Sequence, residues 1–428
     1  MRKTLPLRLY GRALGLAGPL AAGGVLHWRL RKGREIGSRL SERRGIATRP
    51  RPEGPLVWIH AASVGRFTAV LPLVEAIIER GFNVLVTTTT LNAAQLAARR
   101  LPPEAQHQFL PLDVPRYLRR FFDHWRPALL ILAETHVWPN LIVETERRKV
   151  PAVIVNGRIP ERALRLWEKL PRTAHTLLDA VDLCLAQTPD DAQRFIGFGA
   201  HRVSVSGNLK FDAPPPPAPS DDLQRLKRST LGRPVFLAAM THPGEEELVM
   251  HAHILARRHI PDLLTVIVPR HLQRGLEVAQ MAADAGLAVQ MRTYSKDISR
   301  RTEIYVADTT GELGLFYRIA RVAFLGGTLE AGGGHSPMEA AKLGVPILHG
   351  PEIGQYRDIY TALDKSEGAV EIDGSTLSSA VTGLMLDDAT CLQMRHNAGE
   401  TLRLLGGALD HTLIALEPYL IQIRLSAG

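Results

Sequence analysis

Three segments in the second half of the chain carry residues that could bind a phosphorylated ligand, and each follows an apolar run typical of a buried strand. Arg270-His271 follows "LLTVIVP", the segment "TTGEL" at 309–313 follows "EIYVAD", and "TLEAGGGHSPMEAA" at 328–341 follows "VAFLGG". Arg270 supplies a permanent cation suited to a phosphate oxygen. Because ligands of parallel sheets bind outside the carboxyl ends of the strands, we expect these segments to converge.

A glycine run at 332–334 stands immediately before a helical pattern. Backbone N–H groups and the positive end of a helix can meet a phosphate there, and Glu339, one turn into the helix, could hold ribose hydroxyls. The run is neither a P-loop, since no GxxxxGK[ST] occurs, nor a Rossmann GxGxxG. Two interpretations stay open: a nucleotide site built from several loops, or a tight turn without a ligand.

The first half offers two charged candidates. Glu134 ends the apolar run "ALLILAE" and begins "ETHVWPN", so its carboxylate is expected to face a ligand cleft, although capping of the next helix is the alternative. Lys210, in "SGNLKFD", could neutralise negative charge in the cleft or be a solvated lysine near a hinge. No Asp-x-Asp pair occurs, and we assign neither a metal nor a cofactor.

Alternating strand and helix patterns must position these residues. Apolar β-rich runs begin at positions 56, 83, 128, 151 and 181, with amphipathic helical patterns between them. Strands that are apolar on both faces indicate a parallel sheet covered on both sides. The theme repeats after the proline-rich segment 213–220, which we interpret as a semi-rigid linker, with apolar runs that begin at positions 234, 263, 303, 322 and 345. The sequence therefore predicts an α/β protein with two doubly wound Rossmann-like domains, 53–212 and 221–428, and a cleft between them.

The distribution of charge argues against a nucleic-acid partner. The net charge is +9 over 428 residues, yet the first 52 residues hold 13 Lys and Arg against Glu35 and Glu42, so the remainder is nearly neutral. A basic segment before a neutral body is suited to an anionic membrane surface. We therefore interpret residues 1–52 as a membrane-associating N-terminal segment and expect no nucleic-acid binding.

The apolar stretch at 13–26 is too short and too rich in Gly and Pro for a spanning helix. A signal peptide is the alternative, but the Arg-rich sequence that follows favours a helix lying on the cytoplasmic face of the membrane. Cys184 and Cys391 are far apart and have no metal or redox spacing, so we expect buried thiols in a reducing compartment.

Taken together, these motifs resemble the Kdo transferases, the enzymes that transfer 3-deoxy-D-manno-octulosonic acid (Kdo). Matching segments occur in family order and include "WIHAASVG", "AETHVWPNLI", "GNLKFD", "VPRH", "DTTGELG" and "FLGGTLEAGGGHSPMEAA". The resemblance implies a GT-B glycosyltransferase that moves Kdo from CMP-Kdo to a lipid A precursor in lipopolysaccharide synthesis, with inversion. It also implies the cytoplasmic face of the bacterial inner membrane, an N-terminal acceptor domain and a C-terminal donor domain.

Carried over position by position, the resemblance implies roles for particular residues. Glu134 and Lys210 fall where the family stabilises the transition state. The positions that fall where the family contacts CMP are Pro269, Arg270, Thr310, Gly311, Glu312, Ser336, Pro337, Met338 and Glu339.

The acceptor side departs from the family pattern. Arg66 stands where the family has the glutamate that removes the acceptor proton, and a guanidinium has no acceptor atom to offer. His136 replaces a second glutamate, and Ser336 replaces an asparagine. Three explanations stay open: His136 or His60 is a substitute base, Arg66 binds an anionic group of a different acceptor, or the chain is a catalytically silent paralogue that binds nucleotide or lipid.

Overall fold

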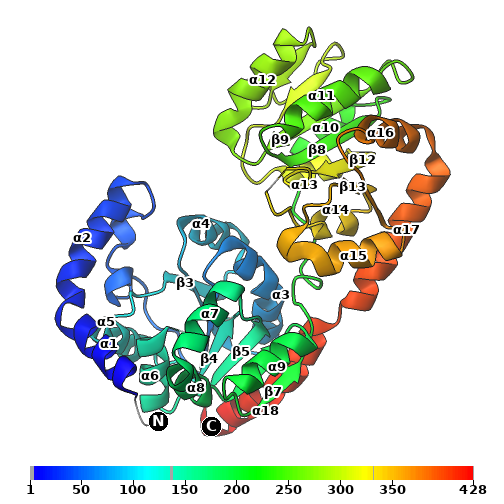
Figure 1. Cartoon of the computed structure of the whole chain (residues 1–428). Helices are drawn as coiled ribbons and strands as arrows, with labels where there is room; N and C mark the ends of the chain where they lie inside the picture. The colour runs from blue at the N-terminus through cyan, green and yellow to red at the C-terminus, as the bar shows by residue number, and fades with distance from the viewer. Residues whose placement is uncertain (1–3, 135–137, 331, 428) are drawn as a thin grey trace. The chain divides into compact units, whose positions relative to one another are not determined.

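The computed structural model describes residues 4–134, 138–330 and 332–427 and divides the chain into two compact units. The first unit contains Met1–Ala213 and Leu405–Gly428, and the second contains Pro214–Leu404 (Figure 1). Each unit is built around its own parallel β-sheet.

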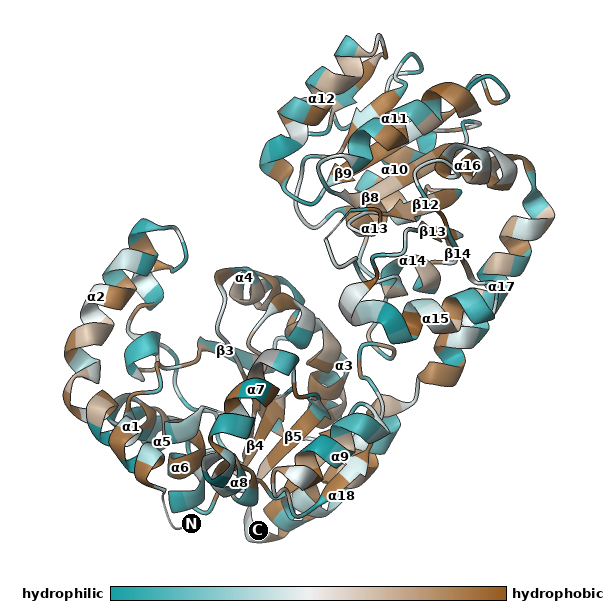
Figure 2. Cartoon of the chain, in the orientation of Figure 1, coloured by the Kyte–Doolittle hydropathy of each residue, from teal (hydrophilic) through white to brown (hydrophobic). Residues whose placement is uncertain are grey.

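The described part of the first unit has a seven-stranded sheet in the order β3-β2-β1-β4-β5-β6-β7, with all neighbours parallel. Central strands β1, β4 and β5 are buried along their whole length, which is why they are apolar on both faces, and β4 and β5 take the hydrophobic colour in Figure 2. The strands are β1 (Leu56–His60), β2 (Asn83–Thr88), β3 (Ala105–Phe109), β4 (Leu129–Ala133), β5 (Ala152–Gly157), β6 (Leu183–Ala186) and β7 (Val203–Val205).

Helices cover both faces of this sheet. The side chains of α3 and α18 pack with one face, and those of α5, α6, α8 and α9 pack with the other. The helical elements are α1 (Leu5–Leu16), α2 (Gly18–Arg31), η1 (Gly37–Arg39), η2 (Glu42–Arg44), α3 (Val64–Glu79), α4 (Leu91–Arg100), α5 (Pro115–Trp125), α6 (Pro139–Arg147), α7 (Glu161–Lys169), α8 (Pro171–Asp179), α9 (Pro189–Gly197) and α18 (Ala408–Ala427).

The second unit repeats the plan. Within the described residues its sheet has seven parallel strands in the order β10-β11-β9-β8-β12-β13-β14, and α11, α12 and α16 bury apolar side chains against it. The strands are β8 (Val235–Thr241), β9 (Leu264–Pro269), β10 (Val289–Met291), β11 (Ile304–Val306), β12 (Val322–Leu325), β13 (Ile347–His349) and β14 (Ala369–Glu371). The helical elements are α10 (Ser220–Ser229), α11 (Glu245–Ala256), η3 (Leu272–Arg274), α12 (Gly275–Asp284), α13 (Leu313–Tyr317), α14 (Met338–Lys342), η4 (Gly354–Tyr356), α15 (Arg357–Lys365), α16 (Leu377–Leu386) and α17 (Asp388–Leu405).

The C-terminal helix departs from the expected assignment of residues 221–428 to a single domain. Helix α18 buries Leu416 and Leu420 in the core of the first unit, beside α3. The Asp212 carboxylate fixes the start of this helix by accepting the backbone N–H groups of Gly407 at 2.8 Å and Leu409 at 2.7 Å. The chain therefore leaves the first unit at residue 213 and returns to it after residue 404.

The proline-rich segment 213–220 is attached to the second unit. The carbonyl of Pro216 accepts a hydrogen bond from Arg318 Nη1 at 2.7 Å, so the segment is tied to the end of α13. Gly314 allows this approach, because a Cβ there would lie 2.4 Å from the carbonyl oxygen of Pro217. Ser220, the last residue of the segment, is the first residue of α10.

Candidate active site

The ends of β4 and β5 in the first unit set the position of Glu134. Glu134 directly follows β4, and Asn156 lies near the end of β5; both have positive φ, 58° and 54°, which is uncommon for residues other than glycine. The backbone N–H of Glu134 bonds the carbonyl of Val155 at 2.9 Å, and Asn156 Oδ1 accepts the N–H of Leu209 at 3.0 Å. These bonds hold the segment of Lys210 beside the end of β4.

The structure brings Arg66, Glu134 and Lys210 together. Arg66, in the first turn of α3, donates from Nε to Glu134 Oε2 at 2.5 Å, and Lys210 Nζ lies 3.5 Å from Oε1 of the same carboxylate. The side chains of Arg66 and Glu134 are only 18% and 15% exposed, so solvent screens their attraction weakly. The result is a partly buried carboxylate between two cations, with a net charge of about +1.

The contact between Arg66 and Glu134 was not foreseen from the sequence. It joins residues 68 positions apart, and it arises because β1, which leads into α3, pairs directly with β4. The sequence does show an arginine in the segment after one inner strand and a glutamate directly after another. Only the order of the strands in the sheet makes these two residues neighbours.

Of the two histidines considered as substitute bases, the structure describes only His60. His60 is fully buried at the end of β1, with Nδ1 within 2.9 Å of Thr87 Oγ1, so this structure does not expose it to an acceptor. This burial argues against His60 as the base. His136 lies outside the described residues.

In the second unit the strand order β11-β9-β8-β12 places the segments expected to bind the nucleotide at neighbouring strand ends. Arg270 follows β9, and its side chain is exposed while its backbone N–H bonds the carbonyl of Thr241 at 2.9 Å. Thr310 and Gly311, between β11 and α13, are also exposed. Gly311 has a φ of 77°, a conformation that favours glycine. Arg270, Thr310 and Gly311 are therefore accessible to a ligand.

Glu312 has a partner within the protein. Arg292, whose side chain is 1% exposed, donates to both carboxylate oxygens of Glu312, at 3.0 and 2.7 Å. Burial acts to raise the pKa of Glu312, but hydrogen bonds from Arg292 and Thr309 outweigh it and bring the pKa below its ordinary value. Arg292 and Glu312 line a hollow of about 640 Å³ together with Thr310. Glu312 thus shapes this loop, and the sequence analysis missed Arg292 because it follows β10, an edge strand of only three residues.

The glycine run does not adjoin a helix start. Helix α14 begins at Met338, four residues after Gly334, and has five residues, so the expectation that the run stands immediately before a helix is wrong. The run instead packs against the loop after β12, where the N–H of Gly334 bonds the carbonyl of Gly327 at 2.7 Å. A Cβ on Gly332 would lie 2.9 Å from the Cα of Gly327, which accounts for glycine there.

The remaining family positions, at the end of β9 and around α14, differ in accessibility. Pro269, Pro337 and Met338 are buried, and Ser336 is half-buried with Oγ 3.4 Å from the N–H of Met338. The Glu339 side chain is exposed to solvent. Partial desolvation by the surrounding protein still raises the pKa of its carboxyl, while the charge of Lys342 opposes the rise. Of this group, Glu339 is the side chain best placed to meet a ligand.

A buried carboxylate and a histidine pair support these loops, and the sequence analysis missed both. Glu245, fully buried at the start of α11, accepts the backbone N–H groups of His242, Gly327, Thr328 and Leu329 at 2.7 to 3.1 Å. His242 Nε2 lies 3.2 Å from His335 Nε2. Burial, with the charges of Arg270 and His242, lowers the pKa of His335 to about 4, so this imidazole is neutral at physiological pH. The acidic first turn "HPGEEE" was the available signal.

Two doubly wound parallel sheets with polar loops at their carboxyl ends define a GT-B glycosyltransferase architecture. A glycosyltransferase from Rickettsia africae has the same fold, with a TM-score of 0.57 and 9% identity over 86% of this chain and 99% of that one. A UDP-GlcNAc 2-epimerase from Neisseria meningitidis shares it with a TM-score of 0.55 and 13% identity over 83% of this chain and 99% of that one. The expected fold is confirmed.

Sequence comparison then gives the family. Residues 38–213 match the family described as 3-Deoxy-D-manno-octulosonic-acid transferase (kdotransferase). The chain is 32% identical to the 3-deoxy-D-manno-octulosonic acid transferase of Haemophilus influenzae over 89% of this chain and 91% of that protein, and 32% identical to that of Bordetella pertussis over 88% and 90%. The chain belongs to the Kdo transferase family. It is a glycosyltransferase that transfers Kdo in lipopolysaccharide biosynthesis.

Proposed function

We propose that this enzyme uses CMP-Kdo as donor and a lipid A precursor as acceptor. The observation that carries the donor assignment is the set of exposed residues after two neighbouring strands of the second unit, Arg270 after β9 and Thr310 and Gly311 after β11. Glu339 is also exposed, on α14 between β12 and β13. A guanidinium beside exposed backbone suits a nucleoside monophosphate. The assignment of Kdo as the sugar comes from membership of the Kdo transferase family.

The transfer forms one bond and breaks another. The acceptor oxygen attacks C2 of Kdo and releases its proton to solvent water, and the bond from C2 to the phosphate oxygen breaks with its electron pair leaving on CMP. In this proposal Arg270 stabilises the charge that grows on the departing phosphate. Glu134 supports the positive charge that develops on the sugar, and Lys210 holds Glu134 in place.

The proton of the acceptor hydroxyl cannot go to Arg66, because a guanidinium has no lone pair to accept it. Arg66 instead holds Glu134 through Oε2, whereas Lys210 lies near Oε1. We propose that the pair of cations also attracts the anionic groups of donor and acceptor. This role needs a net positive charge near the carboxylate, which the trio has.

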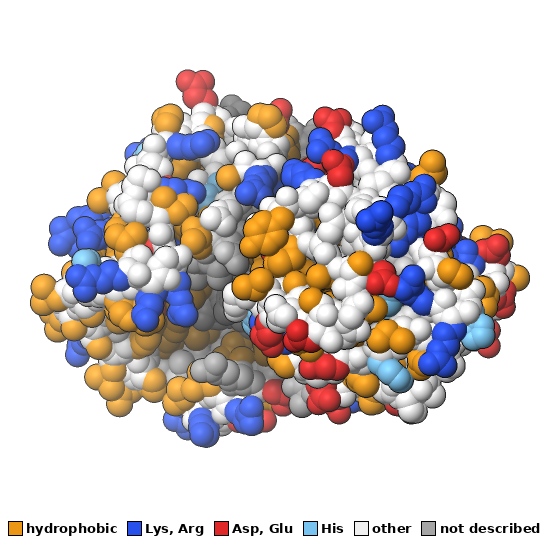
Figure 3. All heavy atoms as spheres, turned by 90° about the horizontal axis from the view of Figure 1, so that it is seen from above, with side chains coloured by type: hydrophobic (Ala, Val, Ile, Leu, Met, Phe, Trp, Pro, Cys, Tyr) orange, Lys and Arg blue, Asp and Glu red, His pale blue; other side chains and the backbone are white. Residues whose placement is uncertain are grey.

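We propose further that the N-terminal helices rest on the cytoplasmic face of the inner membrane. Helices α1 and α2 expose large apolar side chains beside exposed cations, and Figure 3 shows orange and blue side chains interspersed at the left of the view. Such a surface fits the apolar and anionic layers of a bilayer. None of the helices in the described ranges meets the length and hydropathy needed to span a membrane. The apolar residues are Leu5, Leu9, Leu16, Leu20, Val25 and Trp28, and the cations are Arg8, Arg12, Arg31 and Lys32.

A binding and transfer experiment with one variant and one control tests the donor assignment. Arg270→Ala should weaken CMP binding by about 10- to 100-fold, because a hydrogen bond to a charged group contributes about 1.5–3 kcal/mol. Arg258→Ala, which removes another exposed arginine of the same unit, should leave binding unchanged. Calorimetry measures the affinity, and mass analysis of lipid A precursor incubated with CMP-Kdo measures transfer. Equal CMP affinity in both variants would sink the donor assignment.

A further inference from the structure

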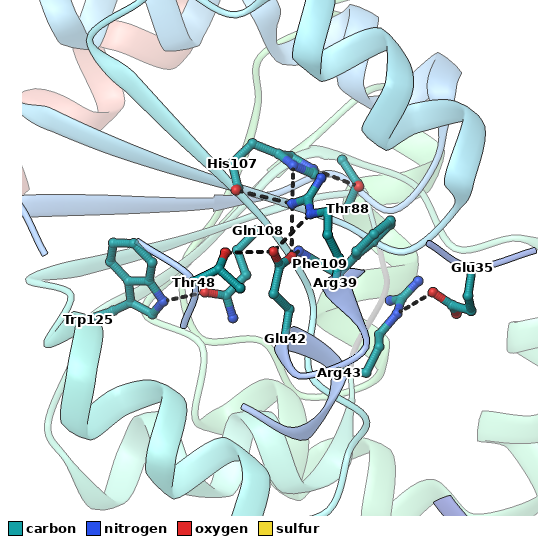
Figure 4. Close-up of polar contacts among 10 residues, drawn as sticks. All are labelled: Glu35, Arg39, Glu42, Arg43, Thr48, Thr88, His107, Gln108, Phe109 and Trp125. Atoms are coloured by element: carbon teal, nitrogen blue, oxygen red, sulfur yellow. Dashed lines mark hydrogen bonds and ion pairs between the residues drawn. The ribbon is translucent and has the colours of Figure 1, made fainter. Parts of the chain in front are cut away.

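A buried ionic cluster joins the segment after α2 to the edge strand β3 of the first unit (Figure 4). Glu42 is fully buried, and its carboxylate accepts two bonds from Arg39 at 2.8 Å, one from Thr48 Oγ1 at 2.8 Å and one from the N–H of Phe109 at 2.7 Å. The charge is therefore paired and hydrogen-bonded, as burial requires. This half of the cluster fixes the segment to β3.

Arg43 forms the other half and is 2% exposed. Its guanidinium uses three different nitrogens: Nε donates to Glu35 Oε2 at 3.1 Å, Nη1 to the carbonyl of Leu110 at 3.2 Å, and Nη2 to the carbonyl of Thr89 at 2.6 Å. The guanidinium also lies 4.2 Å from the centre of the Phe109 ring. Leu110 and Thr89 directly follow β3 and β2, so Arg43 clamps two neighbouring strand ends.

One of those strand ends leads to the acceptor side of the site. The backbone N–H groups of Thr89 and Thr90 both bond the carbonyl of Ala62, at 3.0 and 3.1 Å. Ala62 stands two residues before α3, whose first turn carries Arg66. Bonds therefore run from Arg43 through the segment after β2 to the loop that presents Arg66 to Glu134.

The cluster also reaches the N-terminal helices. Glu35 accepts a bond from Arg29 Nε at 2.7 Å in addition to the one from Arg43. Arg29 lies in the last turn of α2. Glu35 thus ties the helix proposed to lie on the membrane to the arginine that holds the strand ends.

We infer that Arg43 is a positioning residue for the acceptor side of the site, and that Glu35 links it to α2. The kinetic part of this inference rests on the proposed function, whereas the structural part does not. A lysine keeps the charge but has a single nitrogen on a flexible stem, so it cannot hold Glu35, Leu110 and Thr89 in the fixed geometry of a guanidinium. Loss of that clamp releases the segment after β2 and, with it, the loop at Ala62.

The variant Arg43→Lys tests the inference against Arg39→Lys as a matched control. Arg39 belongs to the same cluster and also lies against Phe109, but its guanidinium bonds Glu42 and His107, not the segment after β2. Hydrogen exchange of the full chain reports on the amides of Thr89 and Thr90. We expect about tenfold faster exchange there in Arg43→Lys and no change in Arg39→Lys. Equal exchange in the two variants, or no change in either, overturns the inference.

Kinetics give a second measurement that loss of stability alone would not move. Assayed below the unfolding temperature of both variants, Arg43→Lys should lower kcat/KM for the lipid acceptor by about tenfold, since small misplacements of positioned groups slow transfer. The KM for CMP-Kdo and the dissociation constant for CMP, which belong to the second unit, should stay the same. A parallel loss of CMP binding would contradict a role confined to the acceptor side.

Two further outcomes keep the test decisive. If Arg43→Lys does not fold, Glu35→Gln retains the shape and weakens the same clamp, and it should speed exchange at Thr89 and Thr90 in the same way; unchanged exchange overturns the inference. If the native protein transfers no Kdo to lipid A precursor, the proposed function fails, and the exchange comparison alone then decides the role of Arg43.

Discussion

Replacing Arg66 by Glu reverses a charge that lies 2.5 Å from Glu134. Two unit charges about 4 Å apart interact by about 1 kcal/mol in water and about 4 kcal/mol at the dielectric near a protein surface. The substitution loses an attraction of that size and adds a repulsion, with Lys210 as the remaining cation. Because the shorter side chain can turn away, we expect Arg66→Glu to lower the free energy of unfolding by about 2 kcal/mol at pH 8. Arg66→Gln, which removes only the attraction, should cost about 1 kcal/mol.

The pH dependence separates the two variants. Two neighbouring carboxylates take up a proton more readily than isolated ones, so the folded Glu variant holds a proton that its unfolded state has released at neutral pH. Its stability relative to Arg66→Gln must therefore rise as the pH falls from 8 to 5 and decrease again as the pH rises. Urea unfolding at both pH values measures the difference. A gap that does not change with pH would mean that residue 66 does not interact with Glu134.

The same variant tests the chemistry. Arg66→Glu restores a carboxylate where the family has its general base, and a general base contributes about 10²–10⁴-fold to rate. We expect faster transfer to lipid A precursor than in the native protein, measured by mass analysis of the lipid. Slower transfer than the native rate would refute this reasoning and would show that the support Arg66 gives to Glu134 outweighs the gain from a restored base.

Two other predictions concern the first unit. Leu416→Ala, on α18, should lower its free energy of unfolding by about 2–5 kcal/mol, because the side chain is fully buried in the core beside α3, whereas the exposed neighbour Ile414→Ala should cost well under about 1 kcal/mol; thermal unfolding checks both, and equal costs would contradict the packing of this helix. Burial raises the pKa of Asp113 to about 7 despite opposing bonds from Asn140, Tyr10 and Leu141. Since the folded pKa lies above the unfolded one, the stability that this group contributes is present at low pH and is lost as the pH rises through 7, so native stability should fall relative to Asp113→Asn by about 1 kcal/mol between pH 6 and 8 in urea unfolding; parallel curves would refute it.

The strands that the sequence did and did not predict differ in their place in the sheets. The ten apolar runs identified from the sequence all became strands of the described chain, and the strands missed there are β3, β7, β10 and β14. Each missed strand lies at the edge of its sheet, where one side lacks a partner. Edge strands are less buried, as the half-exposed β10 shows, so their sequences carry little apolar pattern.

Part of the candidate site was predicted from the sequence, and part was not. Strand ends and family motifs were enough to select Glu134, Lys210 and Arg270, because such positions are visible in a linear pattern. The contact between Arg66 and Glu134 and the contact between Arg292 and Glu312 depend on which strands become neighbours, which the local sequence does not encode. The gap between the glycine run and α14 was missed because Gly, Ser and Pro before a helix leave its first residue undetermined.

The return of α18 to the first unit inverts the order in which the two units can be completed on the ribosome. Strands β1 to β7 emerge first, but the core on the α3 side of their sheet lacks Leu416 and Leu420 until α18 is released. The second unit is one continuous stretch, Pro214–Leu404, and can close its core before the chain ends. Translation therefore finishes the later unit first, and the last twenty-residue helix closes the earlier one.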